Sequence, residues 1–403
     1  MSALLVRVGD VEVGILEAFE EENQRFTFVD SYRSALMDSR PILGQIFEDR
    51  FPHAITVDGP ICWFTHLLPQ GVMRRWRARL SGIDEDDSFK MLRILGDNLP
   101  GAVTLSETDS VVPTATPRDL PHREKHKVED SLFRFSLAGA QWKLSAKAAG
   151  RGLTTNATSK GRSKIAKFHA PEYPDLPQCE FGTMTWAGAA GIKVPGFSLR
   201  NTRDFDAIPD QMPVGDGSVY VVDRFDRTDD SRIHMEDFAQ ILDRPPGDHQ
   251  YHGKYEEIGG VMRWVAPESS REFLKLLVFN IISGNGDAHL KNFSLIYPDG
   301  RNAELSLAYD LVATCLYYPV GKEKLALTLD GNKKFKAICS RSFEPLFGSL
   351  CLEVESGNQV VRETVRGALV AWNSQTVQDC FSREQRQKLA THMGSIPLIS
   401  ECS

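Results

Sequence analysis

Three oxygen-bearing side chains stand at spacings that could support chemistry in this chain of 403 residues. Asp287 and Asn292 lie five residues apart in the stretch Gly284–Asn292, and Asp310 follows 18 residues later. A carboxylate can accept the proton of an attacking hydroxyl, and carboxylate and amide oxygens are ligands that Mg²⁺ prefers. The three side chains therefore match what phosphoryl transfer requires, which is positioning of the reactants and neutralisation of phosphate charge.

The segment between Asn292 and Asp310 predicts a β-hairpin. Its expected parts are a strand over 293–297, a turn over 298–300 and a strand over 304–308. Such a hairpin would bring Asn292 and Asp310 together over one metal site. Loop, Asn, hairpin and Asp is also the order found in protein kinases. The alternative is that Asn285-Gly286-Asp287 is an ordinary turn and Asp310 a helix cap.

A lysine that could hold the nucleotide phosphates is predicted upstream. The stretch 163–168 reads as a strand in which Lys167 and Ile165 point to the same face. An inward lysine needs a partner, and Glu180, which opens a predicted helix over 180–191, could orient it. The alternative is a lysine at a sheet edge whose charged end reaches solvent.

Two further stretches fit a nucleotide site. Small residues and a single glycine in 135–143 would let backbone amides approach a phosphate, although an ordinary turn would look the same. The stretch 219–227 is an apolar strand that runs into charged residues, where a kinase hinge would meet adenine. Asp226 could accept hydrogen bonds from the ribose there, and the alternative is a solvated run of charges.

Taken together in this order, the motifs resemble the HipA family of toxin kinases, over nearly the whole chain. The resemblance is carried by Ser136-Leu-Ala-Gly-Ala-Gln-x-Lys143, Ile165-Ala-Lys167, Arg224-Phe-Asp-Arg227, Glu236-Asp-Phe-Ala-Gln240, Gly284-Asn-x-Asp287-x-His289-x-Lys291-Asn292 and Tyr309-Asp310. In the N-terminal third it is carried by Val13-Gly14-x-Leu16, Leu67-Leu-Pro69 and Gly101-Ala-Val-Thr-Leu105.

The resemblance implies an α+β chain with a two-lobed protein-kinase-like fold, an extra small N-terminal α+β subdomain and a mainly helical C-terminal lobe. It implies Asp287 as catalytic base, Asn292 and Asp310 as Mg²⁺ ligands, and Glu180 as the residue that orients Lys167. The ATP contacts that it implies are Ala138, Gly139, Ala140, Lys143, Lys167, Asp223, Phe225, Asp226, His289 and Lys291, with Asp223 and Phe225 contacting adenine through their backbone.

The same resemblance implies a toxin of a bacterial toxin–antitoxin pair. Ser136 matches the position at which the family autophosphorylates, a modification whose negative charge would repel nucleotide phosphates. Substrates in the family include aminoacyl-tRNA synthetases, whose inactivation halts growth and induces persistence. The expected partner is a small helix-turn-helix antitoxin, through which alone the chain would contact DNA. Two departures, Trp142 in place of a charged residue and Asp223 in place of Glu, leave the substrate open.

Domain boundaries follow from changes in composition along the chain. We expect an N-terminal subdomain over 1–112, a Pro-rich linker over 113–130, a nucleotide-binding lobe over 131–226 and a helical lobe over 227–403. Helices are predicted over 70–81, 87–95, 271–283, 359–372 and 382–393. The basic run in the first of these, Arg74–Arg79, predicts a solvated face with Trp76 and Leu80 turned inward, and the alternative is a partner or DNA contact.

Composition narrows the class of protein. A net charge of −7 and a sequence pI near 5.9 argue against nucleic-acid binding as the main role of this chain. Seven cysteines without a C-x-x-C pair indicate reduced thiols and a cytoplasmic protein. No apolar run is long enough to predict a membrane span or a signal peptide. We interpret His289 as a structural hydrogen-bonder and not as a metal ligand.

Two other functions stay compatible with these residues. A kinase that phosphorylates a small molecule would use the same centre, because fold alone does not determine the substrate. A pseudokinase that binds nucleotide and serves only as a corepressor beside the antitoxin is the second alternative. The presence of Lys167, Asp287, Asn292 and Asp310 favours an active enzyme.

Overall fold

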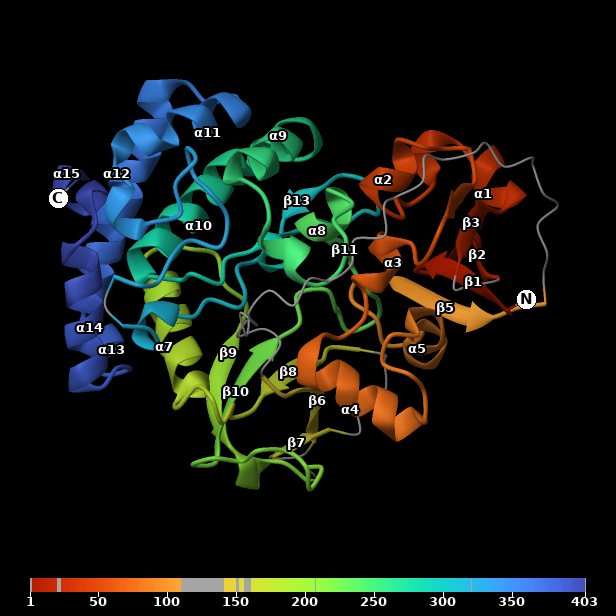
Figure 1. The fold of residues 1–403 in the computed structure, drawn as a ribbon, viewed down its shortest axis with the longest axis horizontal. Coiled ribbons are helices and arrows are strands. Elements are labelled where there is room, and N and C mark those ends of the chain that lie inside the picture. Colours follow the sequence, from red (N-terminus) through yellow and green to blue (C-terminus); the bar gives the residue numbers. More distant parts are fainter. Residues whose placement is uncertain are drawn as a thin grey trace.

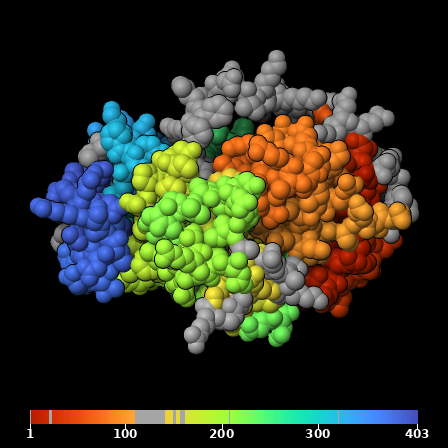
Figure 2. Space-filling model, turned by 90° about the horizontal axis from the view of Figure 1, so that it is seen from below, coloured from red at the N-terminus to blue at the C-terminus, as the bar shows by residue number. Residues whose placement is uncertain are grey.

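The chain folds around three β-sheets that follow one another along the sequence. The computed structural model describes residues 2–19, 23–109, 141–149, 152–155, 161–206, 208–319 and 321–402. In Figure 1 the first sheet lies at the right, the second at the bottom centre, and the C-terminal helices form the left side. The space-filling view of Figure 2 shows the same three parts side by side along the molecule.

The first sheet has the strand order β4-β3-β2-β1-β5, with antiparallel pairs throughout. Its strands are β1 (Ser2–Val8), β2 (Val11–Ala18), β3 (Gln24–Phe28), β4 (Ile55–Val57) and β5 (Val103–Glu107). Alternate residues of β1 are buried, as a sheet with one covered face requires. The helices of this unit are α1 (Asp30–Ser34), α2 (Gln45–Glu48), α3 (Cys62–Thr65), α4 (Gly71–Ser81) and α5 (Ser88–Leu95).

The second sheet has the order β7-β6-β8-β10-β9. Its elements are β6 (Lys143–Ala149), β7 (Gly152–Thr154), β8 (Lys164–Lys167), β9 (Phe197–Asn201) and β10 (Ser218–Asp223), with helix α7 (Leu176–Ala189) between β8 and β9. Alternate residues of β10 enter two different cores. Val219 and Val221 pack with Phe168, whereas Tyr220 and Val222 join the core of the C-terminal helices.

The third sheet, β11-β12-β13, is small and lies among helices. Its strands are β11 (His234–Asp237), β12 (Ser294–Tyr297) and β13 (Glu304–Leu305). The helices of this part are α8 (Phe238–Ile241), α9 (Tyr255–Val265), α10 (Ser270–Ser283), α11 (Glu344–Ser349), α12 (Val354–Trp372), α13 (Gln375–Gln378), α14 (Arg383–Gly394) and α15 (Pro397–Cys402). Two 3₁₀ turns matter for the site, η4 (Asp248–Tyr251) and η6 (Leu290–Asn292).

Several elements differ from the sequence-based expectations. Helix α7 begins at Leu176 and not at Glu180, because Pro177 falls in the first turn, where its missing N–H breaks no helical hydrogen bond. Strand β13 is only two residues long, since the N–H of Ala308 already bonds to the carbonyl of Lys193. Strand β11 was not expected, and Leu80 is 61% exposed and not turned inward.

The expected helices over 70–81, 87–95, 271–283 and 382–393 are all present within a residue of their predicted bounds. Helix α12 starts five residues before its predicted start. Among the described residues, no helix is both long and apolar enough to cross a bilayer. The predicted domain boundaries stay predictions, and the predicted linker 113–130 lies outside the described residues.

Candidate active site

The loop that carries Asp287 is held rigidly at the end of α10. Gly284 ends the helix in the left-handed conformation, with φ of 71°. The buried side chain of Asn285 donates to the side-chain oxygen of Asn280 and accepts from the N–H of Asp287, at 2.8 and 3.0 Å. A Cβ atom at Gly286 would lie 2.5 Å from the backbone carbonyl oxygen of Lys324, which cannot move aside as a flexible side chain can, so glycine is required there.

Asp287 is anchored through both its backbone and its side chain. Its carbonyl accepts from the side-chain amide of Asn292 at 2.7 Å, and its Oδ1 accepts from the hydroxyl of Tyr251 at 2.6 Å. The carboxylate is 13% exposed. Because the amide nitrogen of Asn292 is used in this way, its amide oxygen is left for the pocket that Asn292 lines.

The ring of His289 lies beside this carboxylate, with Nε2 4.0 Å from Oδ1 of Asp287. Its Nδ1 accepts from the N–H of Lys291 at 3.2 Å, so the neutral ring carries its proton on Nε2. Burial, together with the charge of Lys291, lowers the pKa of His289 to about 3. Nε2 is buried without a hydrogen-bond partner among the described residues.

Asp310 is the meeting point of two lysines. Lys167 contacts Oδ1 of Asp310, and the ammonium of Lys143 lies 3.3 Å from Oδ2. Burial would raise the pKa of Asp310, but the two positive charges outweigh it and hold that pKa well below its usual range. Asp310 has φ of 53°, a backbone conformation that residues other than glycine rarely adopt and that is found at functional sites.

Lys167 also forms a buried ion pair with Glu180 of α7. Burial opposes the charge of Lys167, but the carboxylates of Asp310 and Glu180 raise its pKa above the usual value. Burial raises the pKa of Glu180, and the charge of Lys167 counteracts that rise. The three side chains thus join the second sheet, α7 and the end of the hairpin.

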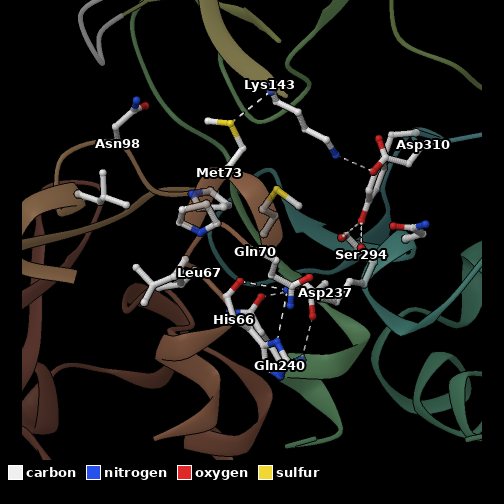
Figure 3. A pocket seen from close by; sticks show the side chains of 18 of the residues that line it. His66, Leu67, Gln70, Met73, Asn98, Lys143, Asp237, Gln240, Ser294 and Asp310 are labelled. Atoms are coloured by element: carbon white, nitrogen blue, oxygen red, sulfur yellow. Dashed lines mark hydrogen bonds and ion pairs between the residues drawn. The ribbon is translucent and has the colours of Figure 1, made fainter. Parts of the chain in front are cut away.

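A pocket of about 380 Å³ opens beside Asp310. Its polar part contains Lys143, Asp237, His289, Lys291, Asn292 and Asp310, and its apolar part contains Leu67, Leu68, Leu95, Pro100, Met235 and Tyr309. Figure 3 shows Leu67 and Asn98 across the pocket from Asp310. One wall of the pocket therefore comes from the N-terminal unit, including Arg77 of α4.

The N-terminal unit is joined to the catalytic loop by a buried polar network. The ammonium of Lys291 donates to Asp237 at 2.6 Å and to the carbonyl of His66 at 3.0 Å. Gln240 donates to the carbonyl of Trp63 at 3.1 Å. Burial, aided by the charge of Lys291, lowers the pKa of His66 to about 4. His66, Asp237 and Gln240 lie together on one side of the pocket in Figure 3, away from Lys143.

Sequence profiles of two domains match this chain in order. The HipA N-terminal domain matches residues 4–106, and the HipA-like C-terminal domain matches residues 135–372. The chain belongs to the HipA family.

Relatives in the family carry kinase names. A Sinorhizobium fredii protein named "Putative kinase Y4dM" is 33% identical over 414 residues, which cover 100% of this chain and 98% of that protein. The "Serine/threonine-protein kinase toxin HipA" of Shewanella oneidensis is 25% identical over 307 residues, covering 66% of each protein.

A solved structure extends the likeness to the fold. HipA of Shewanella oneidensis, determined in a complex with HipB and its operator DNA, matches this chain with a TM-score of 0.68 at 18% identity. The match covers 99% of both chains. The predicted α+β, two-lobed kinase-like fold is thereby confirmed.

Asp226 does not reach the pocket, contrary to the sequence-based expectation of a ribose contact. It is 4% exposed, and both carboxylate oxygens accept from Arg224. Oδ2 also accepts from Arg227 at 2.7 Å and from the N–H of Gly101 at 2.9 Å. Asp226 therefore links the segment that follows β10 to the N-terminal unit, and both of its carboxylate oxygens are already engaged.

The remaining predicted nucleotide-site residues differ in where they lie relative to the pocket. The ring of Phe225 packs on that of Tyr309, which lines the pocket, with ring centroids 5.5 Å apart. The carboxylate of Asp223 pairs with Lys164, and its N–H bonds to the carbonyl of Gly196. Ser136, Ala138, Gly139 and Ala140 lie outside the described residues.

The sequence analysis missed several residues at the site. Tyr251, Arg77 and His66 each come from a segment to which no catalytic role was given. Asp237 and Gln240 stand in a motif that was quoted only as part of the HipA resemblance. Their spacing, Asp237-x-x-Gln240, forms a capping box on α8, and that local pattern could have been recognised.

Proposed function

We propose that this chain is a serine/threonine protein kinase that uses ATP and Mg²⁺. The observation that carries the proposal is that Lys143, Asn292 and Asp310 line one pocket directly beside the loop of Asp287. The buried pair of Lys167 and Glu180 behind Asp310 supports it, as do relatives that are named as kinases.

Charge placement supports the binding of a nucleotide–metal complex. Asp310, ionised beside two lysines, and the free amide oxygen of Asn292 are suitable Mg²⁺ ligands. Among the described residues, no group of three or more His, Cys, Asp or Glu could hold a metal by itself. A site with only Asp310 and Asn292 as protein ligands fits Mg²⁺, because this ion keeps waters and phosphate oxygens as its other ligands. When bound, Mg²⁺ would neutralise phosphate charge, and Lys143 and Lys167 would supply positive charge for the phosphates.

Asp287 would accept the proton of the acceptor hydroxyl. The oxygen of that hydroxyl would at the same time form its bond to the γ-phosphorus, and ADP would leave. Because His289 is neutral and buried, its Nε2–H would donate to a phosphate oxygen without adding a charge. Lys291 is engaged by Asp237 and would act by holding the loop.

The apolar part of the pocket supports a site for adenine. Leu67, Leu95 and Pro100 of the N-terminal unit form a wall there, and Tyr309 lies at the inner side. We place the backbone of Asp223 and Phe225 at the adenine edge, as the HipA resemblance implies. A ribose contact of Asp226 is no longer part of this assignment.

We further propose that the chain acts as the toxin of a toxin–antitoxin pair in the cytoplasm. Family membership and the HipB complex of the Shewanella oneidensis relative support a HipB-like helix-turn-helix antitoxin, with DNA contacted through it. The proposed substrate is a translation enzyme such as an aminoacyl-tRNA synthetase, and Ser136 is the proposed site of self-silencing by autophosphorylation.

The first test is incubation of the purified chain with ATP and Mg²⁺ beside Asp287→Ala, followed by mass spectrometry. We expect phosphate on Ser136 in the active form only, and new phosphoproteins when bacterial lysate is added. ATP binding without phosphate transfer to any protein would contradict the proposal and would favour the small-molecule kinase or the pseudokinase corepressor.

A further inference from the structure

The hydroxyl of Tyr251 makes a short contact with the proposed base. It donates to Oδ1 of Asp287 at 2.6 Å, the distance of a strong O–H···O⁻ hydrogen bond. Tyr251 is the last residue of η4, which lies 36 residues before Asp287 in the chain. The contact therefore joins the catalytic loop to a separate segment of the helical lobe.

The surroundings of Tyr251 fix its position. Its ring meets the ring of His289 edge-on, with centroids 4.6 Å apart and an angle of 83°. Its carbonyl accepts from the ammonium of Lys333 at 3.1 Å. The preceding residue, Gln250, accepts from Gln70 of the N-terminal unit at 3.2 Å. Tyr251 is thus held on three sides and does not depend on Asp287 for its placement.

The last torsion of an aspartate side chain has a broad energy minimum, so the hydrogen bonds that the carboxylate accepts decide its orientation. A base must aim one oxygen at the acceptor hydroxyl within about 3 Å to take its proton. The hydrogen bond from Tyr251 to Oδ1 restricts rotation of the carboxylate and so sets the direction in which Asp287 presents its oxygens to the acceptor.

On the basis of the proposed function, we propose that Tyr251 is a positioning residue that holds the carboxylate of Asp287 for proton abstraction. It acts through Asp287 and does not itself touch either substrate. Its hydroxyl keeps its proton throughout the reaction, because the acceptor hydroxyl delivers its own proton to the carboxylate of Asp287.

The test is Tyr251→Phe, which removes one oxygen and keeps the ring on His289. We expect kcat to fall about 10- to 100-fold, the scale of a misplaced catalytic group. The KM for ATP and the Kd for ATP with Mg²⁺ should stay unchanged, since the nucleotide contacts are intact. A merely structural role would instead lower thermal stability and kcat and would raise the KM and the Kd for ATP together.

Tyr318→Phe is the matched control. Tyr318 lies near enough to Asp287 to interact with its charge, but the Tyr318 hydroxyl forms a hydrogen bond with the hydroxyl of Tyr173. It should keep wild-type kcat. An unchanged kcat in Tyr251→Phe would overturn the proposal. A higher kcat would also overturn it, because it would mean that the Tyr251 hydroxyl competes with the acceptor for Asp287. Phosphate found on Tyr251 would overturn it as well.

A crystal structure of Tyr251→Phe keeps this inference separate from the proposed function. We expect the Asp287 carboxylate to rotate or to occupy two orientations, and this readout needs no turnover. An unmoved carboxylate overturns the role of Tyr251 even in an active kinase. A wild-type protein without kinase activity overturns the proposed function, whatever the orientation of Asp287.

Discussion

Lys167 on β8 and Glu180 on α7 form an ion pair whose side chains are only 4% and 1% exposed. Burying two charges costs several kcal/mol per ion, so such a pair is weak evidence for stability alone. Lys167 also contacts Asp310, which makes it the link between the second sheet and the hairpin. The position of the pair behind the pocket fits a role in holding the lysine for nucleotide phosphates.

Replacing Lys167 by Met should abolish most activity and weaken the fold. We expect kcat/KM for ATP to fall at least about 100-fold, because a positive charge at the phosphates is lost. Glu180 is then buried without its cation, which should lower the free energy of unfolding by about 3 to 5 kcal/mol. Kinase assays and urea unfolding measure the two effects.

A double variant, Lys167→Met with Glu180→Met, separates the two effects. Apolar side chains of similar volume often replace a buried pair without loss of stability. We expect unfolding to return towards the wild type while activity stays lost. Recovery of activity together with stability would show that Lys167 is structural only.

Asp310→Asn should keep the fold near neutral pH but lose phosphoryl transfer. The variant keeps the shape of a metal ligand without its charge, so we expect kcat to fall at least about 100-fold and ATP binding to lose its dependence on Mg²⁺. Titration calorimetry with and without Mg²⁺ measures this, and Mg²⁺-dependent binding in the variant would contradict the assignment.

The low pKa of Asp310 adds a test of stability against pH. A carboxyl whose pKa is depressed on folding stabilises the protein above its ordinary pKa of 3.8 and loses that contribution as pH falls below it. The wild type should therefore lose stability relative to Asp310→Asn on acidification below about pH 4. Equal slopes for the two proteins would show that the lysines do not stabilise the charge.

The sequence allowed prediction of those parts of the site that depend on local patterns. Asp287 and Asn292 lie on one short loop after a helix with clear periodicity, and a hairpin then returns the chain towards Asp310. Such patterns depend on neighbours a few residues apart, where spacing determines which side chains share a face. The pairing of Lys167 with Glu180 follows from the same strand-then-helix order.

The pocket wall from the N-terminal unit could not be predicted in this way. Trp63 and Glu236 are 173 residues apart in the chain, yet they share a buried hydrogen bond. No periodic pattern in the sequence predicts a contact over such a distance. The error at Asp226 has a different cause. The segment was interpreted as a hinge from its place between the lysine strand and the catalytic loop, and the ion pairs of Asp226 with the flanking Arg224 and Arg227 were not foreseen.

Glu236 should make the stability of the interface between the N-terminal unit and the helical lobe depend on pH. Its carboxylate accepts from Trp63 at 3.1 Å and from the N–H of Gln45 at 3.1 Å, and it also accepts from the hydroxyl of Tyr297. Burial nevertheless raises the pKa of Glu236 from 4.5 to about 7. A raised pKa means that its stabilising contribution is complete below pH 4.5 and is lost as pH rises through 7.

Unfolding of the wild type and of Glu236→Gln at pH 5 to 8 measures this effect. The glutamine cannot titrate, so the wild type should lose stability relative to it as pH rises, on the order of 3 kcal/mol in total. Glu268→Gln, at an exposed position, is the control and should run parallel to the wild type. A wild type that gains relative stability with rising pH would refute the prediction.

Arg77 should strengthen the binding of nucleotide phosphates from the N-terminal unit. It lines the pocket and is half-buried, and burial lowers the pKa of its guanidinium. Its guanidinium lies over the ring of Trp76, 4.9 Å from the ring centroid, and no carboxylate of the described residues lies within ion-pair distance of it. A cation without an acidic partner in a polar pocket is suited to an anionic ligand.

Arg77→Ala should weaken the binding of ATP with Mg²⁺ about 10-fold or more and leave that of adenosine unchanged, because adenosine has no phosphates. Arg79→Ala is the matched control, since Arg79 lies on the same helix but is exposed and does not line the pocket. Isothermal titration of both ligands into the three proteins measures the difference. An equal loss for adenosine would instead place Arg77 against the base, and no loss for either ligand would remove Arg77 from the nucleotide site.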